Sequence, residues 1–186
     1  MRADLYDFGP GLSQPLQTGV QSLPPLALAE VEMLGQPEGS LGLLYRLAYS
    51  NDQRLLPYTQ ARWSQAPAVL MQQALRARLG QQRAVLTGDD GLALMSGPGR
   101  MPTVLRVQVE EFSQIFSAPQ QSHGLLRMRA LVADASAAGE TLVAQRLFVV
   151  RRPAATADST GGARALAEAA AQAADELADW LATLGR

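Results

Sequence analysis

Aliphatic and polar residues alternate along three long segments in the second half of the chain. These segments are residues 103–112, 124–133 and 141–151, and a period of two is typical of β-strands that bury one face. A short loop joins the last two, so the three strands are expected to form an antiparallel meander. The alternation slips by one residue near Glu110 and Glu111, which predicts a β-bulge at that point.

The first half of the chain predicts shorter strands. Residues 4–8 alternate, whereas residues 9–25 contain four prolines and three glycines, which indicates a surface loop. Residues 26–34 and 41–49 alternate again. A short turn of glycine, proline and polar residues joins these two segments, so they are expected to form a hairpin. Residues 55–58 contain a proline and are too short for a central strand.

One helix is predicted in the middle of the chain, over residues 67–79. Pro67 suits the first turn of a helix, where its missing N–H costs nothing, and Gly80 is a natural stop at the C-terminal end. Residues 83–87 indicate a short strand after this helix. Residues 88–101 contain four glycines and two neighbouring aspartates, so they are expected to form a loop.

The clearest helical pattern covers residues 163–184, where apolar residues recur at helical spacing and alanines form a face suited to close packing on a sheet. Residues 153–162 are interpreted as a linker, with Ser159 or Thr160 as the N-cap of the helix. The elements together predict a mixed α/β or α+β fold, with a largely antiparallel sheet of about six strands and two main helices. The whole chain is expected to form one domain.

The composition narrows the possible chemistry. The chain has 186 residues, of which 47% are hydrophobic and 18% charged, so it can bury a core and is not disordered. Its net charge of −1 disfavours a surface for phosphate backbones, and no nucleic-acid partner is expected. The chain has no cysteine, no lysine and one histidine. This excludes disulfides, thiolate zinc sites and lysine Schiff bases, and no metal or cofactor is expected.

No local arrangement of residues indicates catalysis. Ser122 and His123 are adjacent, and neighbours in a strand point to opposite faces, so they cannot readily form a proton relay with Asp134. Two pairs of neighbouring carboxylates, at residues 89–90 and 110–111, are explained by a solvated loop and by the predicted bulge. The glycine-rich stretches do not match a phosphate-binding loop. We therefore expect a protein that is not an enzyme.

Aromatic residues and arginines interleave between residues 45 and 63. Two interpretations are open: the aromatic side chains belong to the core and leave polar tips at the surface, or they form a recognition surface for protein or lipid. The apolar residues of the predicted loop at 88–101 are further candidates, because exposed apolar loop residues often mark partner surfaces. The candidate contact residues are Tyr45, Arg46, Tyr49, Tyr58, Arg62, Trp63, Leu92, Leu94 and Met95.

Four motifs follow one another along nearly the whole chain. They are Leu5–Pro10, the aromatic stretch from Tyr45 to Leu70 that enters a helix after Arg62 and Trp63, the strand Val107–Phe112, and the alanine-rich helix that follows Asp158 and ends in Asp179-Trp180-Leu181. Their order resembles the family of ABC-type transport auxiliary lipoproteins, which includes the PqiC-like lipoproteins.

The resemblance implies a periplasmic lipoprotein anchored to the outer membrane, which docks to a mammalian cell entry (MCE) domain protein and an ABC permease that move lipids or other hydrophobic molecules. It also implies a structural role without bond-making chemistry. Members carry a signal peptide and a lipobox cysteine, so Met1 is expected to stand in place of both. The alternative is a stand-alone periplasmic module that binds a lipid or small molecule between the C-terminal helix and the sheet. A homo-oligomer is compatible with either function.

Overall fold

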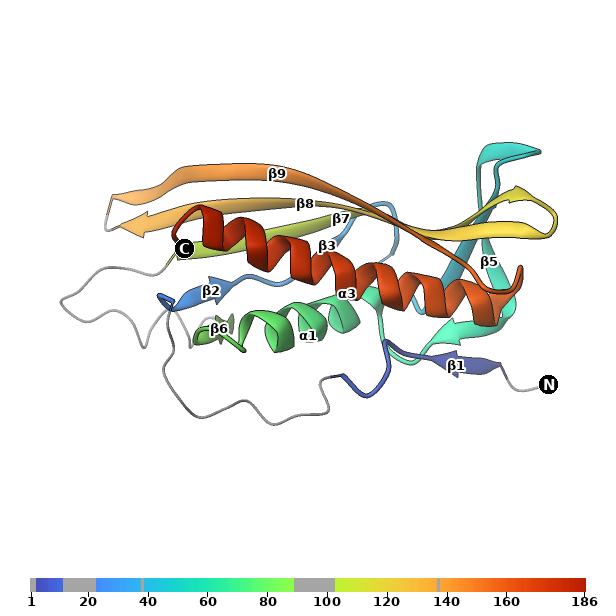
Figure 1. Cartoon of the computed structure of the whole chain (residues 1–186), viewed down its shortest axis with the longest axis horizontal. Coiled ribbons are helices and arrows are strands. Elements are labelled where there is room, and N and C mark those ends of the chain that lie inside the picture. The colour runs from blue at the N-terminus through green and yellow to red at the C-terminus, as the bar shows by residue number, and fades with distance from the viewer. Residues whose placement is uncertain (1–2, 12–22, 38, 89–102, 137) are drawn as a thin grey trace.

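The computed structural model describes residues 3–11, 23–37, 39–88, 103–136 and 138–186. In these ranges a long mixed sheet packs against two helices, as the sequence predicts (Figure 1). The elements, in chain order, are β1 (Asp4–Tyr6), β2 (Leu26–Leu28), β3 (Glu32–Met33), β4 (Gly42–Leu47), β5 (Asn51–Trp63), α1 (Pro67–Leu79), β6 (Val85–Thr87), β7 (Thr103–Ala118), β8 (Gln121–Ser136), β9 (Gly139–Pro153) and α3 (Ser159–Thr183).

β7, β8 and β9 form the predicted antiparallel meander, and each is longer than its alternating segment. β7 and β8 have 16 residues each and β9 has 15. Main-chain hydrogen bonds carry the ladder into polar residues at the strand ends, because these bonds do not require an apolar side chain. The predicted bulge is confirmed, since the register of β7 against β8 shifts between Val109 and Glu111.

The predicted hairpin between residues 26–34 and 41–49 is wrong. The first segment is divided into β2 and β3, which both pair in parallel with β7, and β2 also pairs in parallel with β6. All three residues of β2 are buried, which is typical of a strand inside a parallel arrangement rather than of one arm of a hairpin. β4 ends at Leu47 and lies between β5, which is antiparallel to it, and β7, which is parallel.

The expectation that residues 55–58 do not form a central strand is correct only in part. They belong to β5, a strand of 13 residues. β1 pairs with β5 only at residues 61–63, so β5 is an edge strand where Pro57 lies. Proline is tolerated at such an edge because it has no N–H to donate, and on the free side of an edge strand no neighbouring strand needs that donor.

The two helices begin for different physical reasons. α1 has the predicted bounds, with proline in its first turn and Gly80 as its C-cap. α3 begins at Ser159, earlier than predicted, so residues 159–162 are helical rather than part of a linker. Its N-cap is Asp158, whose Oδ1 accepts a hydrogen bond from the N–H of Gly161 at 2.8 Å. Ser159 and Thr160 are therefore not the cap.

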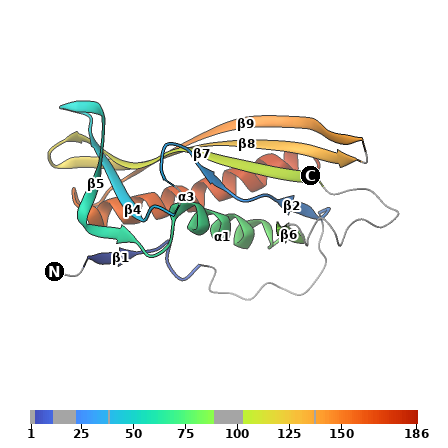
Figure 2. The same cartoon turned by 180° about the vertical axis from the view of Figure 1, so that it is seen from behind.

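α3 lies along one face of the sheet and α1 packs beside it (Figures 1 and 2). Small residues allow a close approach, since a Cβ atom at Gly124 would lie 2.8 Å from backbone atoms of Ala165 and Leu166. The buried residues of α3 are mostly alanines. At Gly124 α3 therefore packs directly against the backbone of β8, which leaves no room for a ligand between them at this point.

Candidate functional site

The β4–β5 pair brings two of the candidate tyrosines together. The ring centroids of Tyr45 and Tyr58 lie 4.6 Å apart. The Tyr58 hydroxyl donates to Oε1 of the buried Gln114 at 2.8 Å, and Nε2 of Gln114 donates to Oγ of Ser122 at 2.8 Å. Burial, followed by the proximity of Tyr45 and Asp158, raises the pKa of Tyr58. Its hydroxyl therefore remains a protonated donor and belongs to a structural network.

Arg46 joins β4 to the bulge of β7. Its Nε and NH2 atoms donate to the two carboxylate oxygens of Glu111 at 3.1 and 3.0 Å. NH1 donates to the carbonyl oxygens of Asp52 and Gln53 at 3.1 and 3.2 Å. All three nitrogen atoms of the guanidinium group donate hydrogen bonds within the chain, so Arg46 has little remaining capacity to donate to another molecule.

Trp63 belongs to the core. It is 1% exposed, and its ring centroid lies 5.5 Å from that of Phe8 and 5.5 Å from that of Phe112. This cluster joins the segment after β1 to β5 and β7. Among the aromatic candidates, Trp63 therefore fits the core interpretation rather than the surface interpretation.

Tyr49 and Arg62 have exposed side chains but lie far apart. Tyr49 is 49% exposed in the turn between β4 and β5. Arg62 is exposed near the opposite end of β5, so the two do not form one patch. Leu92, Leu94 and Met95 lie outside the described residues.

The Ser122, His123 and Asp134 side chains do not come together. Ser122 is buried and bonded to the Gln114 amide. Asp134 lies twelve residues further along β8, about 40 Å away at the usual rise of a strand, where it binds Arg186 at 2.5 Å. Burial, with a smaller effect from a nearby arginine, lowers the pKa of His123.

The carboxylates of the β7 bulge are used in ion pairs. Glu110 accepts hydrogen bonds from Arg127 and Arg129, each at 3.0 Å, and Glu111 binds Arg46. The carboxylates at residues 89–90 lie outside the described residues. Within the ranges that the structure describes, no three metal-binding side chains cluster.

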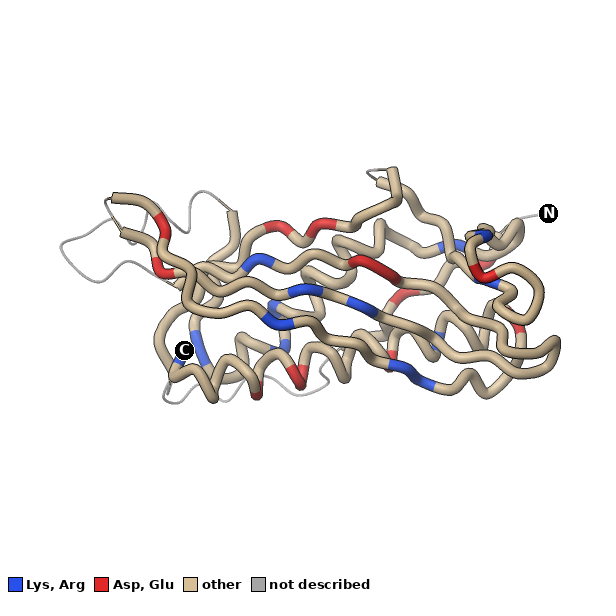
Figure 3. The backbone as a smooth tube through the Cα atoms, turned by 90° about the horizontal axis from the view of Figure 1, so that it is seen from above, with Lys and Arg blue, Asp and Glu red and all other residues tan. Residues whose placement is uncertain are grey.

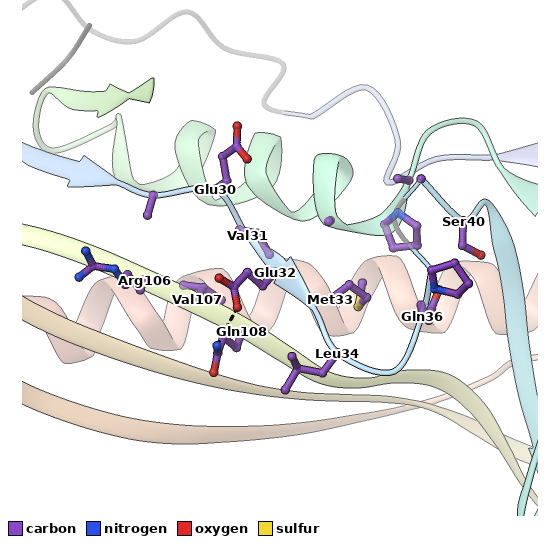
Figure 4. Close-up of a pocket in the computed structure, with 16 residues that line it drawn as sticks. Glu30, Val31, Glu32, Met33, Leu34, Gln36, Ser40, Arg106, Val107 and Gln108 are labelled. Atoms are coloured by element: carbon purple, nitrogen blue, oxygen red, sulfur yellow. Dashed lines mark hydrogen bonds between the residues drawn. The ribbon is translucent and has the colours of Figure 1, made fainter. Parts of the chain in front are cut away.

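A surface groove of about 540 Å³ lies where the segment around β3 passes between the start of α1 and β7 (Figure 4). We call it the β3 groove. Nε2 of Gln108 donates to the Glu32 carboxylate at 2.7 Å, and the Val31 N–H donates to Oε1 of Gln72 at 2.9 Å. Sequence reasoning missed this groove because its walls come from three separate parts of the chain, which a hairpin at residues 26–49 would not bring together.

A second groove, also of about 540 Å³, lies between residues 7–11, α1 and α3. We call it the α1–α3 groove. Phe8, Leu70 and several alanines line it, and an ion pair between Arg78 and Asp175 at 2.5 Å joins the two helices beside it. The alanine-rich face of α3 was the only sequence signal for this feature.

Basic and acidic positions are interspersed along the strands of the meander (Figure 3), and Arg106 lies on the face that points away from α3, since its neighbours Leu105 and Val107 are buried. Arg106 binds Glu140 across the strands at 2.6 and 2.8 Å. Three apolar side chains of β9 are exposed beside these charges: Leu142, Leu147 and Val149. This face therefore combines paired charges with free apolar surface.

Comparison with known proteins identifies the relatives of this fold. A model of the ABC-type transport auxiliary lipoprotein component family matches residues 13–178. The crystal structure of XCC0632 from Xanthomonas campestris, of family DUF330, superposes with a TM-score of 0.76 at 21% identity, covering 98% of this chain and 97% of that one. A crystal structure of an uncharacterized protein has a TM-score of 0.68 at 15% identity, covering 97% and 99%.

No curated protein matches the chain. In the described ranges, no helix combines the length and apolar character needed to span a bilayer.

Proposed function

The chain belongs to the family of ABC-type transport auxiliary lipoprotein components, and from this premise we propose that it is a non-catalytic periplasmic member of an ABC/MCE-type envelope transport system. In this role it docks to an MCE-domain protein and its ABC permease, which move lipids or other hydrophobic molecules. In this proposal a lipid anchor holds the protein at the outer membrane. The family match over residues 13–178 is the observation that carries the proposal.

The side-chain geometry supports docking rather than turnover. Three of the polar groups that the sequence singles out are bonded within the fold: Arg46 to Glu111, Tyr58 to Gln114, and Asp134 to Arg186. A reacting group needs a partner poised to exchange a proton with it and room for a substrate. These groups instead hold strands and the C-terminus in place.

We propose the β4–β5 turn as a contact point for the partner. The hairpin projects beyond the rest of the sheet (Figures 1 and 2). Tyr49 is half exposed at its turn, and exposed tyrosines are enriched at protein interfaces because they add large contact area at low entropic cost.

The test is co-purification, in mild detergent, of the folded chain with the MCE-domain protein and permease encoded near its gene. We expect the wild-type chain to retain the MCE protein and Tyr49→Ala to retain several-fold less. Thr59→Ala, on the exposed side of β5, is the matched control and is expected to bind normally. If the folded wild-type chain captures neither component, the proposed function is wrong.

The α1–α3 groove supports a second candidate, a stand-alone module that binds a lipid or small molecule, although here the ligand would lie between the two helices rather than between α3 and the sheet. Its lining of Phe8, Leu70 and alanines suits an apolar chain. Native mass spectrometry of the purified protein distinguishes this function, since a stoichiometric lipid lost on Ala171→Glu would favour it. A protein of bare chain mass that still binds the MCE partner would exclude it.

A further inference from the structure

β9 is the outermost strand of the meander, and no strand of the described chain pairs with its second edge (Figure 1). Such an edge offers free N–H and C=O groups to any strand that approaches it. β9 also carries exposed apolar side chains: Leu142 is 61% exposed, Leu147 43% and Val149 42%. Their neighbours Phe148 and Val150 point the other way and are buried.

We propose that β9 pairs in antiparallel fashion with β9 of a second copy of this chain, around a two-fold axis at Arg146. In this register Leu142 lies opposite Val149 of the second copy, and Glu140 lies opposite Arg151. The two-fold axis repeats both pairs. Each copy thus contributes the same apolar patch and the same two opposite charges, as a symmetric interface requires.

The bulge in β9 makes this register consistent. In β8 Ala133 pairs with Leu142, but its neighbour Val132 pairs with Ala144. Val143, which lies between these two residues of β9, therefore has no partner in β8 and is the extra residue of the bulge. Leu142 is four residues before the axis and Val149 is three residues after it. The extra residue absorbs this difference and leaves both side chains on the face away from α3.

Neighbouring registers do not give the same match. If the axis moved to Gln145, Leu142 would still meet an apolar residue, Leu147, but Glu140 would lie opposite Val149 and the pair of opposite charges would be lost. If it moved to Leu147, Leu142 would lie opposite Arg151. Cross-strand pairs of opposite charge and of apolar side chains stabilise a sheet, whereas a charge opposite an apolar side chain adds no such stabilisation. The axis at Arg146 is therefore favoured.

The charges at this edge are compatible with pairing. Glu140 already binds Arg106, but a carboxylate can accept from two arginines, as Glu110 does in this sheet. Arg151 has no ion-pair partner among the described residues. The Arg146 guanidinium lies 5.0 Å above the Phe148 ring of its own strand. Each Arg146 side chain thus points towards the C-terminal end of its own strand. In an antiparallel pair the two C-terminal ends lie in opposite directions, so the two guanidinium groups point away from each other.

The first test exchanges the charges. Glu140→Arg and Arg151→Glu each place like charges at both ends of the interface, so each variant alone is expected to weaken dimerisation about tenfold. Mixing the two variants restores opposite charges at both ends, and sedimentation velocity should detect a heterodimer near wild-type affinity. A mixture that associates no better than either variant would contradict the proposed register.

The second test uses the absence of cysteine from the chain. Arg146→Cys places one thiol on the proposed axis, close enough to its counterpart for a disulfide, and mild oxidation should give a covalent dimer. Ala182→Cys, on an exposed position of α3, is the control and should remain monomeric.

A wild-type protein that sediments as a monomer at every concentration, with no cross-linking at position 146, would overturn the proposal. The purified chain would also be a monomer if the β9 edge paired with a strand of another protein, and the proposed homodimer would be wrong in that case too. Both tests use the purified chain alone, so their result is independent of whether the MCE partner binds.

Discussion

At the residue scale, the amide of Gln114 occupies a position that no local pattern reveals. It is fully buried in a strand whose alternation predicts an apolar residue there, and it bonds Tyr58 from β5 and Ser122 from β8. A Cβ atom at Gly162 would lie 1.9 Å from its Oε1 atom. Gly162, which the sequence assigns to a linker, is therefore the place where α3 passes this side chain.

We expect Tyr58→Phe to lower the free energy of unfolding by about 1–3 kcal/mol, because it leaves the buried Oε1 of Gln114 without a donor. Tyr49→Phe removes a hydroxyl from an exposed ring and should have no measurable effect. Urea denaturation of the two variants gives the comparison. Equal stabilities would show that the buried hydrogen bond contributes nothing.

Asp158 is the second residue whose role depends on geometry. Hydrogen bonds from the Gly161 N–H and from Thr156 lower the pKa of its carboxyl. Asp158→Ala should therefore cost about 1 kcal/mol at neutral pH, as is usual for loss of an N-cap. Because the folded pKa is below the ordinary value, this stabilisation is present above that value and is lost as the pH falls through the folded pKa.

The measurement is urea unfolding of wild type and Asp158→Ala at neutral pH and at a series of acidic pH values below the ordinary carboxyl pKa, over which the two stabilities should converge. Asp179→Ala, an exposed substitution near the other end of the same helix, removes a negative charge from a C-terminal turn and should be neutral or slightly stabilising. A difference for Asp158→Ala that persists unchanged in acid would rule out the charged cap.

At the element scale, the sequence predicts what is local. β7, β8, β9 and α1 follow from alternation, helical spacing and turn residues within each segment. The pairing of β2 and β4 cannot be predicted in this way, because both strands pair with β7, which lies more than fifty residues away from each of them along the chain. The grooves depend on the same distant contacts, which is why only the alanine-rich face of α3 hinted at one of them.

The alanines of α3 make its contact with the sheet sensitive to side-chain size. We expect Ala170→Leu, at a fully buried position, to destabilise the protein by about 1–3 kcal/mol through overpacking. Ala182→Leu, at an exposed position of the same helix, is expected to change stability by less than about 0.5 kcal/mol. The melting temperatures of the two variants are compared by circular dichroism. Equal melting temperatures would mean that the α3–sheet interface can accommodate the larger side chain without loss of stability.

At the scale of the whole molecule, the long strands and α3 run along one axis and share one core (Figure 1). Both tryptophans of this core pack against phenylalanines: Trp63 against Phe8 and Phe112, and Trp180 against Phe148. Because residues from both halves of the chain contribute to the same apolar cluster, we expect the halves to unfold together.

Differential scanning calorimetry should therefore give one transition, with a calorimetric enthalpy equal to the van't Hoff enthalpy. Trp63→Ala, which is expected to cost about 3–5 kcal/mol, should shift the whole transition downwards rather than divide it. Two resolved transitions would show that residues 1–186 form more than one folding unit.

The distance along the chain between β8 and the helix that covers it has a consequence for folding. The inward face of β8, with Leu126 and Met128 at its centre, packs against α3, which begins only at Ser159. An intermediate in which the meander has formed but α3 has not yet docked therefore exposes a broad apolar surface, and such intermediates are prone to aggregation. Docking of α3 removes that surface from water.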